Sequence, residues 1–332
     1  MQLIKDTLQG LTLGHPTTFL NLTVFPLHGT KAGGQRAYVT LRESLADRTV
    51  SITEVSEGGN VPNLRLENTG TRPVLILDGE ELVGAKQNRI ANVTILAPAK
   101  DTIIIPVSCV EQGRWAYRSR DFNSSERAQF SDARRAKMSR VSASLRRAGT
   151  YDANQGQVWD ELALKADRMG VRSSTSAMAD MYEHYETRTE DYTQAFSGQT
   201  DQPGAVFAIG DRVAGLELFD SPATFGEMLP KLVRSYAIDA IESIAAHRRN
   251  PSAVQATALI DQLLQAKIET YPAVGLGTDV RLTAPGVVAG GLRHEDRLVH
   301  LAAFNLPADE GRLDQPPPYR RSMSRRRRQM GG

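Results

Sequence analysis

The stretch "VLILDGEELVGAKQNR", residues 74–89, places a dense polar segment directly after a run of four apolar residues. Four such residues in succession are typical of a buried strand, and the Asp-Gly pair that follows is a turn signal. The twelve residues that begin at Asp78 hold three acids, two cations and two carboxamides. Because buried charges need partners, this stretch predicts a polar site at the end of a β-strand.

Strand-like runs continue on both sides of this stretch, from about residue 17 to residue 110. They are rich in Val, Ile, Leu and Thr and are separated by Gly, Asn and Pro, which is typical of an all-β sandwich or barrel-like domain. The predicted strands are 21–25, 37–41, 50–54, 64–68, 74–77, 90–96 and 102–107, with a short helical turn at 43–46.

The apolar period changes to that of helices between residues 124 and 196. A cap at 124–126 predicts a first helix that ends at Gly149, and further helices are predicted at 157–169 and from about 174. Beyond residue 199 we predict a hairpin with strands at 204–209 and 213–219, then a helix from Pro222 that kinks or restarts at Pro230. The remaining predicted elements are a helix at 252–270 and strands at 280–282, 286–292 and 298–304.

This order of elements predicts an α+β protein. We expect a β-rich domain at residues 1–120, a helical segment at 121–200, and a smaller mixed α/β unit at 201–306 that packs on the first domain. A hydrophobic share of 40% and a charged share of 23% fit a soluble globular protein, and no stretch has the ~18 apolar residues of a membrane helix. The only cysteine is Cys109, so we expect a reducing, cytoplasmic location.

The C-terminal segment, residues 307–332, differs from the rest of the chain. It carries seven arginines against three acids, whereas the net charge of the whole chain is only +2. With three consecutive prolines and little apolar surface, it is expected to be disordered. Such a basic tail either captures nucleic acid or another polyanion, or serves as a solubilising extension.

A second polar cluster follows the predicted strand at 102–107. Its sequence "EQGRWAYRSR", residues 111–120, alternates two aromatic residues with three arginines, a composition suited to stacking on a base while holding phosphates. If the strands before the two clusters are neighbours, the clusters meet at one end of a sheet. The predicted ligand-binding residues are Asp78, Lys86, Gln87, Asn88, Arg89, Glu111, Arg114, Trp115, Tyr117 and Arg118.

The carboxylates of Glu80 and Glu81 are the predicted catalytic groups, as acid, base or magnesium ligand. The cofactor is otherwise unknown, and the scattered histidines predict no metal site. No phosphate-binding loop, dinucleotide fingerprint or nucleophile elbow is present in the sequence. The alternative interpretation of both clusters is a solvated loop with internal ion pairs.

Several longer strings together resemble a known family. They are "VSITEVSEGG", "DGEELVGAKQNR", "PVSCVEQGRWAYRSR", "QGQVWD" and "KLVRSYAIDA". They are similar to the bacterial domain family named for its association with ADP-ribosylglycohydrolases and rhodanese-phosphatase-superfamily proteins, over residues 11–304. The resemblance implies a context in NAD-derived and ADP-ribose metabolism, and it assigns no catalytic residue.

The expected function is therefore binding of an ADP-ribose-like or other phosphorylated nucleotide. Lys86, Arg89 and Arg114 would hold its pyrophosphate, and Trp115 or Tyr117 would stack on its adenine. If the protein is an enzyme, it would be a hydrolase of such a ligand. The alternative is a non-enzymatic interaction protein that holds nucleic acid or an acidic partner through the tail and a basic helix at residues 134–147. The sequence predicts no oligomeric state.

Overall fold

The computed structural model describes residues 1–29, 36–56, 58, 61–244 and 251–307. It confirms the α+β class, since helix accounts for 33% and strand for 36%, and neither dominates. The tail predicted to be disordered lies outside the described residues, apart from its first residue. None of the helices within the described ranges is long and apolar enough to cross a membrane.

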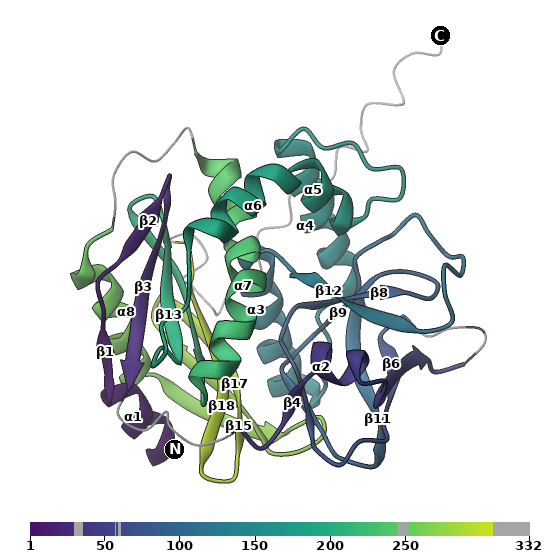
Figure 1. Ribbon diagram of the computed structural model, residues 1–332, viewed down its shortest axis with the longest axis horizontal. Helices are drawn as coiled ribbons and strands as arrows, with labels where there is room; N and C mark the ends of the chain where they lie inside the picture. Colours follow the sequence, from purple (N-terminus) through teal and green to yellow (C-terminus); the bar gives the residue numbers. More distant parts are fainter. Residues whose placement is uncertain (30–35, 57, 59–60, 245–250, 308–332) are drawn as a thin grey trace.

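The largest sheet in the described part of the chain has nine antiparallel strands (Figure 1). Its order is β1-β3-β13-β14-β18-β17-β16-β15, and β2 also pairs with β3. The strands are β1 (Leu11–Leu13), β2 (Thr17–Phe19), β3 (Leu22–Gly29), β13 (Gly204–Ile209), β14 (Arg212–Phe219), β15 (Lys267–Pro272), β16 (Thr278–Ala284), β17 (Val287–His294) and β18 (Arg297–Asn305). Residues from the N-terminal and C-terminal parts of the chain therefore share one sheet.

The second large sheet has six antiparallel strands among the described residues, in the order β12-β8-β9-β11-β6-β5. They are β5 (Val50–Glu54), β6 (Asn63–Asn68), β8 (Glu80–Gly84), β9 (Arg89–Ala91), β11 (Asp101–Cys109) and β12 (Phe122–Ala128). A small sheet, β10-β7-β4, consists of β4 (Val39–Thr40), β7 (Val74–Ile76) and β10 (Ile95–Ala97). The opening stretch of the sequence thus passes from the small sheet into the six-stranded one.

Helices cover both faces of the nine-stranded sheet. The described helices are α1 (Gln2–Gln9), α2 (Leu41–Ala46), α3 (Ser131–Ala148), α4 (Gln155–Arg168), α5 (Met178–His184), α6 (Glu186–Ala195), α7 (Pro222–Ser243) and α8 (Ala253–Leu264). One face is covered by α1 and α8, while α3 and α7 lie on the other, between the two large sheets (Figure 1). Helix α7 contacts β12 of one large sheet and β13 of the other.

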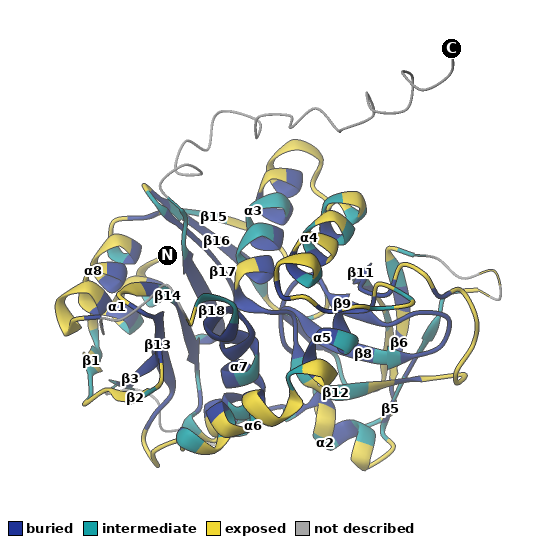
Figure 2. Cartoon of the chain, turned by 90° about the horizontal axis from the view of Figure 1, so that it is seen from above, coloured by how far each residue is buried: buried dark blue, intermediate teal, exposed yellow. Residues whose placement is uncertain are grey.

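Strand β13 shows why this sheet needs helices on both faces. Its six residues are all buried, and they alternate between two separate hydrophobic clusters. Phe207 packs in the cluster that contains α7, whereas Val206 and Ala208 pack in the cluster that contains α1 and α8. Figure 2 shows the resulting pattern, with dark blue buried strands inside and exposed residues on the outer helices. Because successive side chains of a strand point to opposite faces of the sheet, β13 contributes to the hydrophobic cores on both faces.

The predicted cap at residues 124–126 is wrong, because these residues belong to strand β12 and helix α3 begins at Ser131. The hydroxyl of Ser124 donates to Glu80 (2.6 Å) and that of Ser125 donates to Glu81 (3.0 Å). Neighbouring carboxylates of β8 therefore use the hydroxyls that would otherwise cap a helix. The tertiary contact overrides a local preference for a cap.

Four other elements differ from the sequence prediction. The predicted strand at 90–96 splits into β9 and β10, which lie in different sheets, and the strand at 37–41 is shortened to Val39–Thr40 because Thr40 caps α2. The helix predicted at 252–270 ends at Leu264, and Lys267–Pro272 pairs with β16 as an edge strand. Pro230 lies inside α7, which does not restart there. The hairpin at 204–219 and the end of α3 at Gly149 are confirmed.

A network of buried charges joins α3 to the strands on either side of it. Asp78 lies 2.5 Å from the ammonium of Lys137 and 3.5 Å from Arg134. Arg134 also pairs with Glu217 of β14 at 2.5 Å, and His300 of β18 contacts Glu217 at 3.1 Å. The side chains of Lys137, Arg134, Glu217 and His300 are completely buried. The opening stretch is therefore linked through α3 to the centre of the nine-stranded sheet.

The pKa values of these groups follow from burial and pairing. Burial acts to raise the pKa of Asp78, but the charges of Lys137 and Arg134 outweigh it and hold the pKa below its usual value. Burial likewise opposes ionisation of Glu217, and Arg134 and His300 more than compensate, so its pKa is also lowered. Burial lowers the pKa of Lys137 to about 8, despite the attraction of Asp78. At neutral pH the network therefore holds two carboxylates against at least two cations.

Substituting Glu217→Gln leaves Arg134 as an incompletely compensated buried charge, so we expect a loss of roughly 3–5 kcal/mol in the free energy of unfolding. Urea denaturation at pH 7 measures it. The matched control is Glu126→Gln, because Glu126 pairs with Arg42 at the surface (3.8 Å), where both side chains are more than half exposed. The control should change stability by about 1 kcal/mol or less. Equal effects of the two substitutions would show that the network does not hold the fold together.

The advantage of the wild type over Glu217→Gln should shrink in acid. In the unfolded chain Glu217 titrates near its ordinary value of 4.5, and in the folded protein it titrates lower. As the pH falls, the unfolded chain takes up this proton first, so the stabilisation from Glu217 is complete above the unfolded value and lost below it. Urea denaturation of both proteins from pH 6 to pH 3 tests this. A difference that stays constant, or that grows in acid, contradicts the assignment.

Candidate functional site

The two polar clusters meet at one end of the six-stranded sheet. They meet through the connection between β8 and β9, residues 85–88 of the first cluster, and the segment after β11 that contains the second cluster, residues 111–120. Arg118 donates its backbone N–H to the carbonyl of Ala85 (3.0 Å), and Gln87 donates to the carbonyl of Gln112 (3.4 Å). The clusters therefore converge, but the strands before them are not neighbours: β7 lies in the small sheet, and the two segments meet because β9 pairs with β11.

Arg114 is the main link between the two segments. Its guanidinium donates to the carbonyls of Ala85 (2.7 Å) and Gly84 (3.3 Å) and to the side-chain oxygen of Asn88 (3.1 Å). It also pairs with Glu111 at 2.7 Å, and the same carboxylate accepts the backbone N–H of Asn88 (3.1 Å). Burial acts to raise the pKa of Glu111, but these hydrogen bonds hold it below its usual value. One buried arginine thus fixes both segments.

The turn between β8 and β9 requires a glycine. Gly84 has φ = +141°, and a β-carbon there would lie 2.4 Å from the carbonyl oxygen of Asp121. Ala85 follows at φ = +37°, a conformation that residues with a side chain rarely adopt. Its carbonyl is the acceptor for both Arg114 and Arg118. The contacts to the second segment therefore help to hold Ala85 in this conformation.

Two exposed aromatic rings flank the ammonium of Lys86. The nitrogen lies 5.2 Å from the ring centre of Trp115 and 5.1 Å from that of Tyr117. The lysine is buried, whereas the two aromatic residues are 49% and 54% exposed. Large aromatic groups held at the surface by a cation are available to stack on a ligand.

An open cavity of about 660 Å³ is lined by one of these two aromatic residues, Tyr117. It has three arginines and one glutamate in its wall, and we call it the arginine cavity. Its lining residues are Thr53, Glu54, Val55, Ser56, Arg65, Tyr117, Arg118, Ser119 and Arg120. The sequence predicted only Tyr117 and Arg118 among them as ligand-binding residues. The segment between the predicted strands 50–54 and 64–68 contains Gly58 and Gly59, which is a signal for a hairpin. The strand ends that such a hairpin brings together carry Glu54 and Arg65.

Glu54 of this wall and Arg89, which does not line the cavity, form an incomplete pair. Arg89 is fully buried and donates one hydrogen bond, to the side-chain oxygen of Gln87 (3.0 Å). Its other terminal nitrogen lies 3.9 Å from Glu54, too far for a hydrogen bond. Burial lowers the pKa of Arg89, and Glu54 offsets part of this effect. This pair lacks the direct contacts that the other buried charges of the site have.

Glu80 and Glu81 lie apart from the arginine cavity. Glu80 accepts from Lys231 of α7 (2.6 Å) and from the backbone N–H of Leu77 (3.0 Å). Glu81 accepts from Arg127 of β12 (2.7 Å). Both carboxylates are buried and neither lines the cavity. Their catalytic roles stay predictions, and the structure does not bring them together with the arginines. Asp78 belongs to the buried network of α3.

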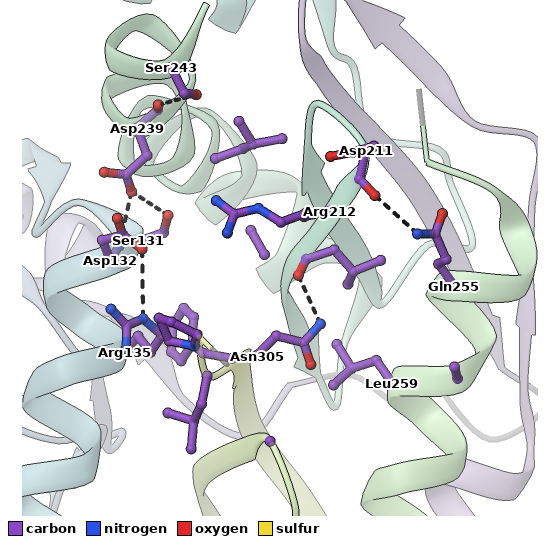
Figure 3. Close-up of a pocket in the computed structure, with 18 of the residues that line it drawn as sticks. Ser131, Asp132, Arg135, Asp211, Arg212, Asp239, Ser243, Gln255, Leu259 and Asn305 are labelled. Atoms are coloured by element: carbon purple, nitrogen blue, oxygen red, sulfur yellow. Dashed lines mark hydrogen bonds and ion pairs between the residues drawn. The ribbon is translucent and has the colours of Figure 1, made fainter. Parts of the chain in front are cut away.

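No group of three or more His, Cys, Asp or Glu side chains within the described ranges is arranged to hold a metal ion. A second cavity, of about 620 Å³, lies between α3, α7, α8 and the β13–β14 turn (Figure 3). One of its lining acids, Asp239, accepts hydrogen bonds from the hydroxyl of Ser131 (2.5 Å), the N–H of Asp132 (2.9 Å) and the ammonium of Lys165. That carboxylate is already satisfied internally, whereas Glu54 beside the arginine cavity is not.

Comparison with protein families gives one match. A family model described as the ARG and Rhodanese-Phosphatase-superfamily-associated Protein domain matches residues 10–304. The chain belongs to this family. The match confirms the resemblance seen in the sequence and includes the whole candidate site, while residues 305–332 lie outside it. Comparisons with curated proteins and with solved structures gave no match.

Replacing Arg114 by lysine should loosen both segments, because an ammonium cannot reproduce the planar fork that contacts four oxygen acceptors and a carboxylate. We expect Arg114→Lys to lose about 2–3 kcal/mol in the free energy of unfolding. Arg120→Lys is the matched control, since Arg120 is exposed at the cavity rim, and it should leave stability within ~0.5 kcal/mol. Urea denaturation of both variants tests this, and an Arg114→Lys variant as stable as the control would contradict it.

Proposed function

We propose that the arginine cavity binds an ADP-ribose-like or other phosphorylated nucleotide, and that the protein acts in NAD-derived metabolism. The observation that carries the proposal is the composition of its wall, in which Arg65, Arg118 and Arg120 lie beside the exposed ring of Tyr117. Guanidinium groups bind phosphate oxygens through paired hydrogen bonds, and an aromatic face can stack on a base.

The size of the cavity is compatible with such a ligand. Sites for small molecules and cofactors usually enclose roughly 300–1,000 Å³, and this cavity encloses about 660 Å³. Three arginines and the carboxylate of Glu54 line the cavity, and one of the arginines, Arg118, also lies 3.8 Å from Glu111. The remaining positive charge favours an anionic ligand such as a pyrophosphate. The family name adds an association with ADP-ribosylglycohydrolases, which is consistent with a ligand derived from ADP-ribose.

Binding of the nucleotide and its hydrolysis would use the same side chains of the arginine cavity. If the bound nucleotide is hydrolysed, the arginines would stabilise the negative charge that develops on phosphate. We propose a cytoplasmic location, because the single cysteine, Cys109, is buried and free.

The second candidate function is capture of nucleic acid through α3 and the tail. Within α3, Arg134 and Lys137 are completely buried in ion pairs. Arg140 pairs with Glu161 of α4, and Arg146 pairs with Glu269 of β15. Cations that already have internal partners contribute little to a nucleic-acid surface. The ion pairs within α3 therefore argue against nucleic-acid binding by this helix and favour the nucleotide proposal. The second candidate function then rests on the arginines of the tail, residues 307–332.

Calorimetric titration with ADP-ribose tests the proposal. Wild-type protein should bind, and Arg118→Ala and Arg120→Ala should each weaken the affinity about tenfold, since each removes a charged hydrogen bond to phosphate. Arg42→Ala is the control, because Arg42 is an exposed arginine that does not line the cavity. Deletion of residues 307–332 should leave the affinity unchanged. Absence of binding, or a salt-sensitive loss of binding on deletion of the tail, would overturn the proposal.

A further inference from the structure

The incomplete pair of Glu54 and Arg89 differs from every other buried acid and arginine in the described part of the chain. Glu54 is the one described carboxylate whose two oxygens are both buried without a hydrogen-bond partner. Arg89 has two such nitrogens, whereas Arg114 and Arg134 have one each. Buried polar atoms are nearly always satisfied, so a cluster of four unsatisfied ones indicates that a further group belongs there.

The geometry of the pair defines the chemistry of that group. The nitrogen and oxygen are 3.9 Å apart, and a single oxygen atom can lie about 2.8 Å from both of them. This atom must accept a hydrogen bond from Arg89 and donate one to Glu54. A phosphate oxygen cannot donate when it is ionised, and an ammonium cannot accept, so neither bridges the pair. A hydroxyl group or a water molecule does both.

The position of Glu54 links this group to the ligand of the arginine cavity. Glu54 is part of the cavity wall, together with Arg65, Arg118 and Tyr117. Only 4% of its side chain is exposed and both of its oxygens are buried, so contact with a ligand requires this side chain to turn toward the cavity. In a nucleotide, the ribose lies between the phosphates and the base. The ribose hydroxyls would therefore lie between the phosphates, which bind to the arginines, and the base, which stacks on the aromatic ring.

We propose that Glu54 and Arg89 form a ribose subsite, which selects ligands with free 2′ and 3′ hydroxyls over deoxynucleotides. This inference rests on the proposed function. A vicinal diol can donate one hydrogen bond to each carboxylate oxygen of Glu54, and one of its oxygens can accept from Arg89. The class of ligand is thereby narrowed from phosphorylated nucleotides to ribonucleotides.

The test compares ADP with 2′,3′-dideoxy-ADP by calorimetric titration of the full chain. A site built to bind hydroxyls leaves its own groups unpaired when they are missing. We therefore expect the dideoxy compound to bind at least tenfold more weakly than ADP. In Glu54→Gln this ratio should fall to about threefold or less, because the amide has one acceptor oxygen where the carboxylate has two, and its NH2 group can only donate. Glu67→Gln, an exposed position on β6, is the control and should keep the wild-type ratio.

The outcomes separate the two proposals. Equal binding of ADP and its dideoxy analogue to the wild type would overturn the ribose subsite while leaving nucleotide binding intact, with an ordered water between Arg89 and Glu54. Binding of neither ADP nor ADP-ribose would overturn both. The comparison of ligands on the wild type needs no variant, so it decides the question even if Glu54→Gln fails to fold.

Discussion

The structure depends on one constraint, namely that a charge removed from water must find an opposite charge or several hydrogen bonds. Helix α3 meets this constraint between the two large sheets, where Arg134 binds Glu217 and Lys137 binds Asp78. Apolar side chains on α3 could fill the same space, but they would not specify the position of this helix relative to each sheet. We interpret the network as the device that sets this register, because each of its cations must face a particular carboxylate.

The same constraint explains the candidate site and its exception. Arg114 and Glu111 satisfy each other and tie the β8–β9 turn to the segment after β11. This rigid frame places Tyr117 and the neighbouring arginines at the rim of a cavity. Arg89 and Glu54 remain short of partners. Most other buried charges of the described residues have a direct partner, and we propose that this pair is left open because the ribose of a bound ligand completes it.

Much of this arrangement can be predicted from the sequence. The apolar run before Asp78 and the alternation of aromatics with arginines at 111–120 identify both clusters, because such patterns reflect local physical needs. The consecutive strands β5 and β6 carry Glu54 and Arg65, but no pattern in the sequence places this strand pair beside residues 117–120. Ser124 is mistaken for a helix cap because its hydroxyl donates a hydrogen bond to Glu80, which lies 44 positions earlier in the chain. The local sequence does not reveal this contact.

A crystal structure of the protein with ADP-ribose is the most direct test of the central claim, that the arginine cavity is the ligand site. The account predicts the pyrophosphate within hydrogen-bonding distance of two of the three arginines in the wall, and the adenine against Tyr117 or Trp115. A ligand bound instead in the cavity between α3, α7 and α8, with the arginine cavity empty, would contradict it.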